Sequence, residues 1–138
     1  MAGLPPIISI ITPSYNRVDE LKHLYQSLKN QSVDPSLFEF IVSDDGSTDS
    51  TKEIIKNYPE VILINNKINS GNGASVKKGI LRTTKEYLVL LDADGQHPPK
   101  AIKRLLDHAI ENDYDLVVAS RKGKIIYSIS IINILSNG

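Results

Sequence analysis

Cysteine is absent from this chain of 138 residues, and neither sign of charge is in excess, because 16 Lys and Arg balance 16 Asp and Glu. The missing thiols exclude a disulfide framework, a thiolate nucleophile and a thiolate zinc site. A formal net charge of zero argues against a dedicated nucleic-acid-binding protein, in which a basic excess is usual. The histidines, which are His23, His97 and His108, do not stand at the spacing of a zinc-binding helix.

Long hydrophobic runs are also missing. The longest apolar stretch, residues 125–135, is much shorter than the roughly 20 residues that span a bilayer. The first residues lack the basic n-region of a secretory signal peptide, so we expect none. The length suits one domain of about 100–200 residues, and 41% of the residues are hydrophobic. We therefore expect a single soluble, cytoplasmic domain with a real core.

Short apolar segments rich in β-branched residues alternate with segments of helical periodicity. Strands are expected at residues 7–11, 38–43, 61–64, 87–91 and 116–119. Helices are expected between them, starting at Asp19, at Thr48 or Asp49, at Ala74, and at Pro98 or Pro99. This alternation predicts an α/β fold with right-handed crossovers and a mostly parallel sheet flanked by helices.

Ligands of such sheets bind beyond the carboxyl ends of the strands. The loops at that edge are expected at residues 13–17, 44–49, 92–97 and 120–124. The sequence therefore predicts that the chemistry of the protein lies in these segments.

Paired carboxylates follow the apolar run 87–91. Asp92 and Asp94 stand two residues apart, so both can point the same way and share one cation. Hard oxygen ligands favour Mg²⁺ or Mn²⁺ over zinc. A solvated turn is the alternative, but a buried strand end is a costly place for two like charges without a counterion. The pair therefore favours a cation site with coordination positions left for diphosphate oxygens.

A second acidic loop follows the expected strand 38–43. Asp45, with Asp44 as the second choice, can accept hydrogen bonds from the N–H of a nucleobase or from ribose hydroxyls. Capping of the next helix is the alternative and accounts for Ser47, Thr48 and Asp49.

The remaining signals are weaker. Residues 69–73 open a helix and could present backbone N–H groups to an anion, although a plain turn with a helix cap is the favoured interpretation. Arg121 could clamp a phosphate through two hydrogen bonds, or it could be an ordinary surface residue. For His97, which precedes two prolines, a structural role is favoured over a ligand or a base.

Taken together, these segments resemble glycosyltransferase family 2. The motifs, in the order usual for that family, are Ile11–Asn16 (ITPSYN), Ser43–Asp49 (SDDGSTD), Asn69-x-Gly71 and Leu91–Pro99 (LDADGQHPP). The segment 94–99, followed by residues 115–117 and by Ser120 and Arg121, is most similar to the polyprenol-phosphate (dolichol-phosphate) mannosyl- and glucosyltransferase branch. The resemblance covers residues 6–122.

This resemblance implies the type A glycosyltransferase fold, with residues 1–122 as a Rossmann-like half that binds a UDP- or GDP-sugar. It implies an inverting, metal-dependent transfer of a hexose, in which metal and arginine together offset the charge that builds on the leaving diphosphate. The resemblance also implies the site residues. Pro13, Tyr15 and Asn16 would line the nucleoside pocket, and Asp45 would hold the base or ribose. Asp92 and Ala93 would lie along the donor, Asp94 and Gln96 would hold Mg²⁺ or Mn²⁺ with Asp92 contributing, and Arg121 would meet the diphosphate.

Two departures from the family leave questions open. Arg17 stands where the lipid-phosphate branch often has Glu, so the preferred base is undecided. Relatives also continue well beyond Arg121, so residues 123–138 are expected to be an apolar tail, the start of a truncated acceptor region. The spacing fits an amphipathic helix at a membrane surface, a strand, or a segment packed on the sheet or on a second copy in a homodimer.

The acceptor is expected to be a polyprenyl phosphate, because a phosphate is already an anion and can attack the anomeric carbon without a protein base. The alternative function is a truncated, non-catalytic module that binds a nucleotide sugar or a partner chain. A nucleotidyltransferase is disfavoured, because residues 12–17 lack the glycine- and lysine-rich loop usual in those enzymes.

Overall fold

The computed structural model describes residues 8–30, 38–58, 60–83, 85–91, 99–118 and 129–133. Its elements follow in the order β1 (Ile8–Ser14), α1 (Val18–Lys29), β2 (Phe38–Asp44), α2 (Thr51–Ile55), β3 (Val61–Asn65), α3 (Asn72–Arg82), β4 (Tyr87–Leu91), α4 (Pro99–Asn112), β5 (Leu116–Val118) and β6 (Ile129–Asn133). The expected alternation of strands and helices is confirmed up to β5. No helix in this described part of the chain is long and apolar enough to cross a bilayer.

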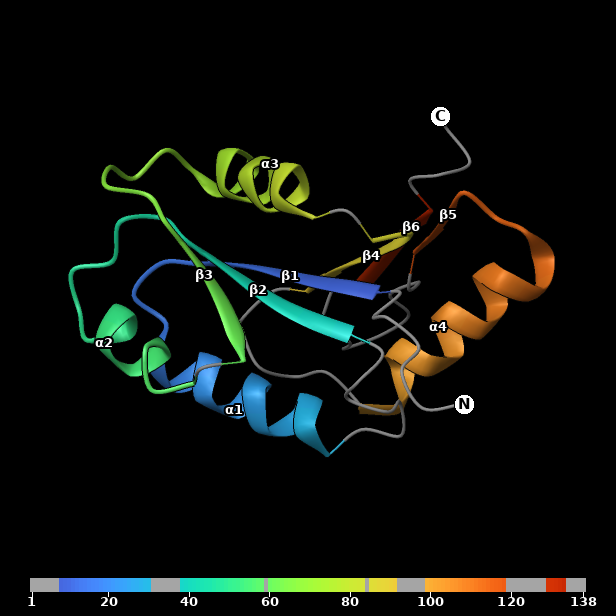
Figure 1. The fold of residues 1–138 in the computed structure, drawn as a ribbon, viewed down its shortest axis with the longest axis horizontal. Helices are drawn as coiled ribbons and strands as arrows, with labels where there is room; N and C mark the ends of the chain where they lie inside the picture. The colour runs from blue at the N-terminus through green and yellow to red at the C-terminus, as the bar shows by residue number, and fades with distance from the viewer. Residues whose placement is uncertain are drawn as a thin grey trace, which may run out of the picture.

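The strands form one sheet in the order β3-β2-β1-β4-β6-β5 (Figure 1). The four strands from β3 to β4 are parallel, whereas β6 runs antiparallel to both of its neighbours. The mostly parallel sheet is therefore confirmed. Strand β1 extends to Ser14, past the expected end at Ile11, because its pairing with β2 continues to Asp44. Pro13 can belong to this strand because it lies beyond the pairing of β1 with β4, which stops at Ile11.

Strand β6 corrects one expectation for the apolar segment 125–135. The helical alternative is wrong for residues 129–133, which form a strand between β4 and β5. Ile132 lies opposite Leu88 in the ladder and packs against the cluster that contains it. The physical reason is that β4 and β5 each need a partner for their backbone groups, and a strand at this position supplies both ladders.

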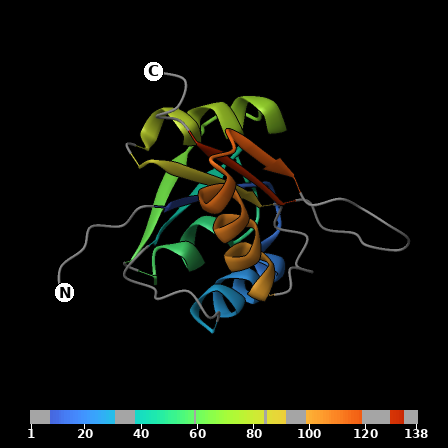
Figure 2. The same cartoon turned by 90° about the vertical axis from the view of Figure 1, so that its right-hand side faces the viewer.

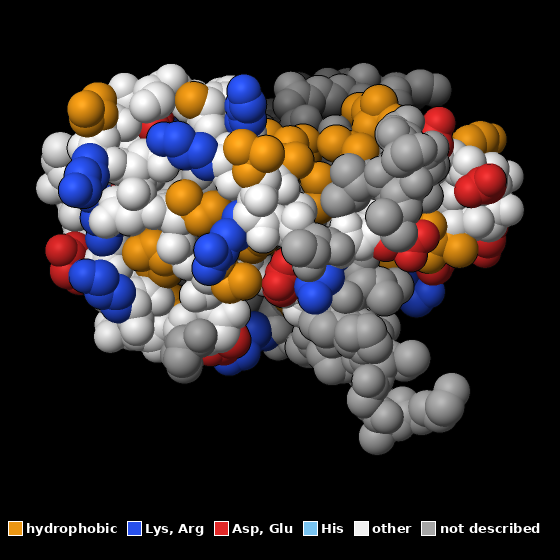
Figure 3. Space-filling model, turned by 45° about the horizontal axis from the view of Figure 1, so that its top comes forward, with side chains coloured by type: hydrophobic (Ala, Val, Ile, Leu, Met, Phe, Trp, Pro, Cys, Tyr) orange, Lys and Arg blue, Asp and Glu red, His pale blue; other side chains and the backbone are white. Residues whose placement is uncertain are grey.

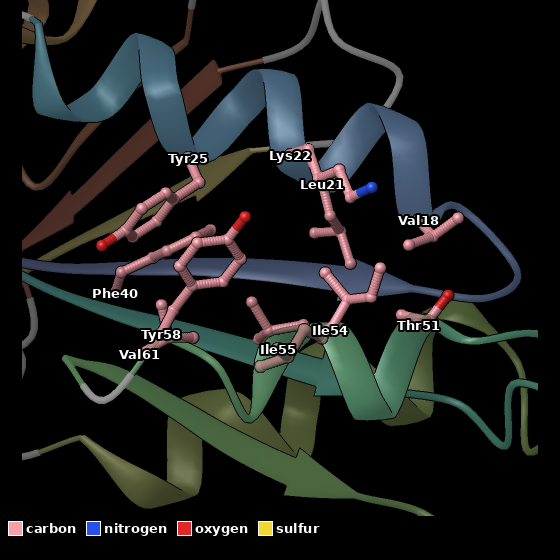
Figure 4. Close-up of a pocket in the computed structure, with 11 residues that line it drawn as sticks. Val18, Leu21, Lys22, Tyr25, Phe40, Thr51, Ile54, Ile55, Tyr58 and Val61 are labelled. Atoms are coloured by element: carbon pink, nitrogen blue, oxygen red, sulfur yellow. The ribbon is translucent and has the colours of Figure 1, made fainter.

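Helices cover both faces of the sheet. Helices α1, α2 and α4 pack on one face, where the main core contains Ile10, Leu24, Ile55, Val89 and Ile102 (Figure 2). Helix α3 covers the opposite face above the smaller cluster of Ile11, Ile41 and Leu88. Between α1 and α2 the gap measures only about 10 Å³, and its lining includes Leu21, Tyr25, Phe40, Ile55 and Tyr58 (Figure 4). This space holds at most about one water molecule, so it belongs to the packed core.

The expected helix starts are partly wrong. Helix α1 begins at Val18 with Arg17 at the N-cap, and Asp19 lies in the first turn, where a carboxylate favours the helix dipole. Helix α2 begins at Thr51 after Ser50, because the backbone N–H groups of Thr48 and Asp49 are bonded elsewhere, to Asn16. Helix α3 begins at Asn72, two residues before Ala74.

Candidate functional site

The loops that follow β1, β2 and β3 meet at the carboxyl edge of the sheet, on the left in Figure 1. Backbone hydrogen bonds continue from strand to strand beyond the regular ladders. Asp45 N–H donates to the carbonyl of Ser14 at 2.8 Å, and Asn66 N–H donates to the carbonyl of Asp44 at 2.9 Å. Backbone hydrogen bonds therefore hold the first residues of the second and third loops beside the neighbouring strand ends.

Asn16 joins the first loop to the second. Its backbone lies in the left-handed region, with φ of 52°, a conformation that asparagine tolerates better than most residues. Its Oδ1 accepts N–H hydrogen bonds from Thr48 at 2.8 Å and Asp49 at 3.2 Å. Its own N–H donates to Ser47 Oγ at 2.9 Å. Asn16 thus holds residues 47–49 at this edge of the sheet, and its place in a nucleoside pocket stays a prediction.

Asp44 is fully buried and serves the turn that follows β2. Its carboxylate accepts hydrogen bonds from Ser47 N–H at 3.0 Å and from Ser47 Oγ at 2.5 Å. Ser47 is therefore bonded to Asp44 and does not cap α2, as the capping alternative supposed. Asp49 does accept the N–H of Thr51 at 2.9 Å, which leaves part of that alternative in place.

Asp45 joins the second loop to the third. One carboxylate oxygen accepts the N–H of Ser70 and the other accepts the N–H of Gly71, both at 2.8 Å. Burial alone would raise the pKa of Asp45, but these donors, with the side chains of Ser75 and Asn66, hold the pKa below its ordinary value of 3.8. The N–H groups of Ser70 and Gly71, for which an external anion was the less favoured partner, thus meet the carboxylate of Asp45.

Gly46 lets the second and third loops touch. Its φ is +82°, and a Cβ at this position would lie 3.1 Å from Asn69 N and 3.3 Å from the carbonyl carbon of Ile68. Only a residue without a side chain fits both the conformation and the contact. The role of Gly46 was not predicted, although its place directly after two aspartates and before a serine is a turn signal.

Two further predicted residues lie beside these loops. Pro13 is buried within β1, whereas Tyr15 directly beyond the strand is 43% exposed. The described part of the chain therefore brings Pro13, Tyr15, Asn16 and Asp45 to the same sheet edge. Tyr15 presents the largest apolar surface of this group to solvent, which is what stacking against a flat ligand requires.

Three buried hydroxyl groups near this edge lack a hydrogen-bond partner among the described residues. They belong to Thr12, Ser14 and Ser43. These hydroxyls lie near the carboxyl ends of β1 and β2. Sequence reasoning missed them, because nothing in the pattern distinguishes a bonded hydroxyl from an unbonded one.

The other predicted site residues lie outside the described residues: Asp92, Ala93, Asp94, Gln96, His97 and Arg121. The chain leaves β4 at Leu91, and β4 is the neighbour of β1 in the sheet. Within the described ranges, no group of three or more histidine, cysteine, aspartate or glutamate side chains comes together as a metal site. The predicted metal ligands and the diphosphate-binding arginine thus stay predictions.

Comparison with known proteins agrees with this geometry. Poly(ribitol-phosphate) beta-glucosyltransferase of Bacillus spizizenii is 32% identical over 121 residues, which are 84% of this chain and 19% of that protein. Dolichol-phosphate mannosyltransferase of Pyrococcus furiosus is 32% identical over 118 residues, which are 83% of this chain and 33% of that protein. The chain thus spans a third or less of the length of these curated relatives.

Among solved structures, the mannosyltransferase PcManGT from Pyrobaculum calidifontis, in complex with GDP-Man and Mn²⁺, superposes with a TM-score of 0.81 at 15% identity. The match covers 94% of this chain and 45% of that protein. Structural neighbours of this kind identify the sheet and its helices as the type A glycosyltransferase fold. Residues 9–128 match the sequence model of glycosyl transferase family 2, and the chain belongs to that family.

Proposed function

We propose that this chain is the donor-binding part of an inverting, metal-dependent glycosyltransferase that transfers a hexose from a nucleotide-diphospho-sugar to a polyprenyl phosphate. The observation that carries the proposal is the junction of three loops at the carboxyl edge of the sheet, held by Asn16 and Asp45. Ligands of parallel α/β sheets bind at this edge. Residues 1–122 are the proposed donor-binding domain, and residues 123–138 are the proposed start of an acceptor region.

The nucleoside is proposed to bind between Tyr15 and Asp45. Tyr15 offers an exposed aromatic face, and Pro13 and Asn16 are proposed to line the pocket with it. Because its pKa is lowered, Asp45 stays ionised at neutral pH. Its oxygens accept the N–H groups of Ser70 and Gly71, and a base N–H or a ribose hydroxyl is proposed to replace the side-chain donor Ser75 or Asn66. The complex of PcManGT with GDP-Man supports a nucleotide sugar as the ligand.

The divalent metal is proposed to be Mg²⁺ or Mn²⁺, held by Asp94 and Gln96 with Asp92. Two carboxylates and an amide oxygen form a hard donor set that fits either ion. The metal would supply charge neutralisation on the leaving diphosphate. Asp92 and Ala93 are proposed to lie along the donor, and Arg121 is proposed to donate hydrogen bonds to the diphosphate. The Mn²⁺ in the complex of PcManGT supports this choice of ion.

The acceptor is proposed to be a lipid phosphate presented at a membrane surface, with the protein peripheral to the cytoplasmic face. A phosphate oxygen would attack the anomeric carbon as an anion while the bond from that carbon to the diphosphate breaks and the nucleoside diphosphate leaves, so no protein base is needed for this step. The relative that acts as a dolichol-phosphate mannosyltransferase supports this acceptor class. The alternative remains a binding module without catalysis, because the chain spans only part of its relatives.

Titration calorimetry with UDP and GDP, each with and without Mn²⁺, tests the donor site. We expect one of the two nucleotides to bind, and to bind more tightly with Mn²⁺. Asp94→Ala should remove the gain due to Mn²⁺, whereas the control Asp107→Ala, an exposed residue of α4 paired with Lys103, should not. Binding of neither nucleotide, or an unchanged gain in Asp94→Ala, would contradict the proposal.

An assay for the transfer of radiolabelled hexose to a polyprenyl phosphate distinguishes a catalytic function from that of a non-catalytic binding module. Lipid-linked label that appears only with the complete protein, metal and donor supports catalysis. Tight nucleotide binding without transfer or donor hydrolysis favours the non-catalytic alternative.

A further inference from the structure

Charge is distributed unevenly along this neutral chain. The segment 65–85 contains five basic residues and no acidic residue, whereas the whole chain has 16 of each. The basic residues of the segment are Lys67, Lys77, Lys78, Arg82 and Lys85. A segment of this composition contributes a positive field to the surface on which it lies.

Helix α3 presents most of this charge on its outer side. Ser75 and Gly79 are buried against the sheet, whereas Lys77, Lys78 and Arg82 are exposed. No ion pair found in the described ranges includes any of these three cations. Figure 3 shows Lys and Arg side chains, with hydrophobic side chains between them, over the part of the surface that α3 and its preceding loop occupy. Within the described ranges, therefore, no carboxylate forms an ion pair with Lys77, Lys78 or Arg82.

Two aliphatic side chains of the same basic segment, residues 65–85, are strongly exposed. Leu81 on α3 and Ile68 in the loop before it are each 76% exposed, more than any other large hydrophobic residue in the described ranges. Leu81 also lines an open hollow of about 390 Å³ with Leu63, Ile64, Lys78 and Arg82. We call the surface formed by Lys77, Lys78, Leu81, Arg82 and Ile68 the α3 face.

We propose that the α3 face docks on an anionic lipid bilayer. Exposed aliphatic side chains among lysines and arginines are the pattern by which a helix lies on a membrane, with the apolar tips at the acyl boundary and the cations at the phosphates. A nucleic acid would satisfy the cations but would leave Leu81 and Ile68 without an apolar partner. The bilayer is the occupant that matches both halves of the pattern.

The orientation that follows has a consequence for the reaction, which rests on the function proposed above. Helix α3 starts at Asn72, next to the loop that Asp45 holds, and runs away from the carboxyl edge. A helix that lies flat on the bilayer therefore brings this edge beside the lipid head groups. A lipid-phosphate acceptor would meet the donor there without leaving the membrane.

Sedimentation with lipid vesicles, in the absence of nucleotide, tests the docking. We expect the protein to bind vesicles of equal parts phosphatidylcholine and phosphatidylglycerol, to bind pure phosphatidylcholine weakly, and to be released by salt. The triple variant Lys77→Glu, Lys78→Glu, Arg82→Glu should bind at least about 100-fold more weakly, because each basic residue at such a surface contributes roughly fivefold. The control Lys22→Glu, Lys56→Glu, Arg104→Glu has the same net charge and lies at exposed positions of α1, of the turn after α2 and of α4, so it should lose much less.

A second variant separates membrane docking from diffuse charge. Leu81→Ser with Ile68→Ser leaves every charge in place and should still weaken vesicle binding severalfold. Equal losses in the two triple variants, no loss in the serine variant, or tighter binding to RNA than to the anionic vesicles would overturn the proposal. Nucleotide calorimetry on the same variants should be unchanged, so a failure of docking is distinguished from a failure of the donor site.

Discussion

At the scale of single residues, Asp45 shows how a buried carboxylate can serve the fold and the site together. Its two oxygens hold the backbone of Ser70 and Gly71, some 25 residues further along the chain. Hydrogen bonds from N–H donors to a charged acceptor are stronger than those between neutral groups. The loop that leads into α3 is therefore fastened by an ionised side chain, and its position depends on that charge.

Asp45→Asn should lower the free energy of unfolding by about 1–3 kcal/mol at neutral pH. One backbone N–H of the loop would then face the NH₂ group of the asparagine, which cannot accept its hydrogen bond. The folded pKa of Asp45 lies below its ordinary value of 3.8, so its contribution is fully present above that value and is lost as pH falls through the folded pKa. The difference between wild type and variant should thus be constant from pH 5 to 7 and shrink below about pH 4. Urea denaturation over this pH range measures it.

Glu111→Gln, an exposed position of α4, is the matched control and should change the free energy of unfolding by less than about 0.5 kcal/mol. An Asp45→Asn difference that persists unchanged to low pH would show that the carboxylate charge does not hold the loop.

The candidate site could be predicted from the sequence only as far as residue types and order allow. Asp45, Asn16 and Tyr15 stand in loops after strands, and their place at one edge follows from the parallel topology. Their partners could not be predicted, because Asn16 reaches Thr48 and Asp45 reaches Gly71 across loops whose conformations depend on tertiary contacts. That the Thr12 hydroxyl lacks a hydrogen-bond partner among the described residues could not be predicted either, since a sequence pattern does not report hydrogen bonds.

At the scale of elements, α3 approaches β1 unusually closely because of a glycine. A Cβ on Gly79 would lie 2.5 Å from Cγ2 of Ile11, a fully buried side chain. Gly73, in the first turn of the same helix, has no positive φ, and no atom of the described residues lies within 4 Å of where its Cβ would stand. The structure therefore requires a glycine at position 79, where a side chain would clash, but not at position 73.

Gly79→Ala should destabilise the protein by about 1–3 kcal/mol, because the added methyl group overpacks the contact with Ile11. Gly73→Ala should be neutral or stabilise it by up to about 1 kcal/mol, through helix propensity alone. Midpoints of urea denaturation compare the two variants under the same conditions. If both alanines had the same effect, the close contact between α3 and β1 would not be the determinant.

Element prediction succeeded where local pattern and tertiary need agree. The run from Tyr87 to Leu91 is apolar throughout and forms a strand with those bounds, as a strand buried on both faces must. Helix starts were less predictable, since Asn16 takes the amides that a cap at Thr48 or Asp49 would have left to α2. The sequence could not distinguish a strand from a helix at β6, because its isoleucines fit both the helical and the strand period. The strand is favoured only because the backbones of β4 and β5 need a pairing partner.

At the scale of the whole molecule, β6 joins two parts of the sheet. In the described structure β5 pairs only with β6, and β6 pairs in turn with β4. The short strand β5 is thus connected to the parallel core through residues that follow it in the sequence. The order of strands in space departs here from their order in the chain.

Removal of residues 129–138 should lower the free energy of unfolding by about 2 kcal/mol or more, because the burial of Ile132 and two strand ladders is lost. A chain of this size should then melt about 5–10 °C lower. Removal of residues 134–138 alone keeps β6 and is the control. Circular dichroism on heating measures both, and equal melting temperatures would show that β6 is dispensable.

The placement of β6 also sets an order of events on the ribosome. Strands β1 to β4 can pair as soon as they leave the ribosome. Strand β5 has no strand to pair with until Ile129–Asn133 has been synthesised. Until then Val117 of β5, which is buried in the main core of the folded chain, has no ladder to hold it there. A nascent chain paused between these two strands is therefore the form of this protein that a chaperone would most readily engage.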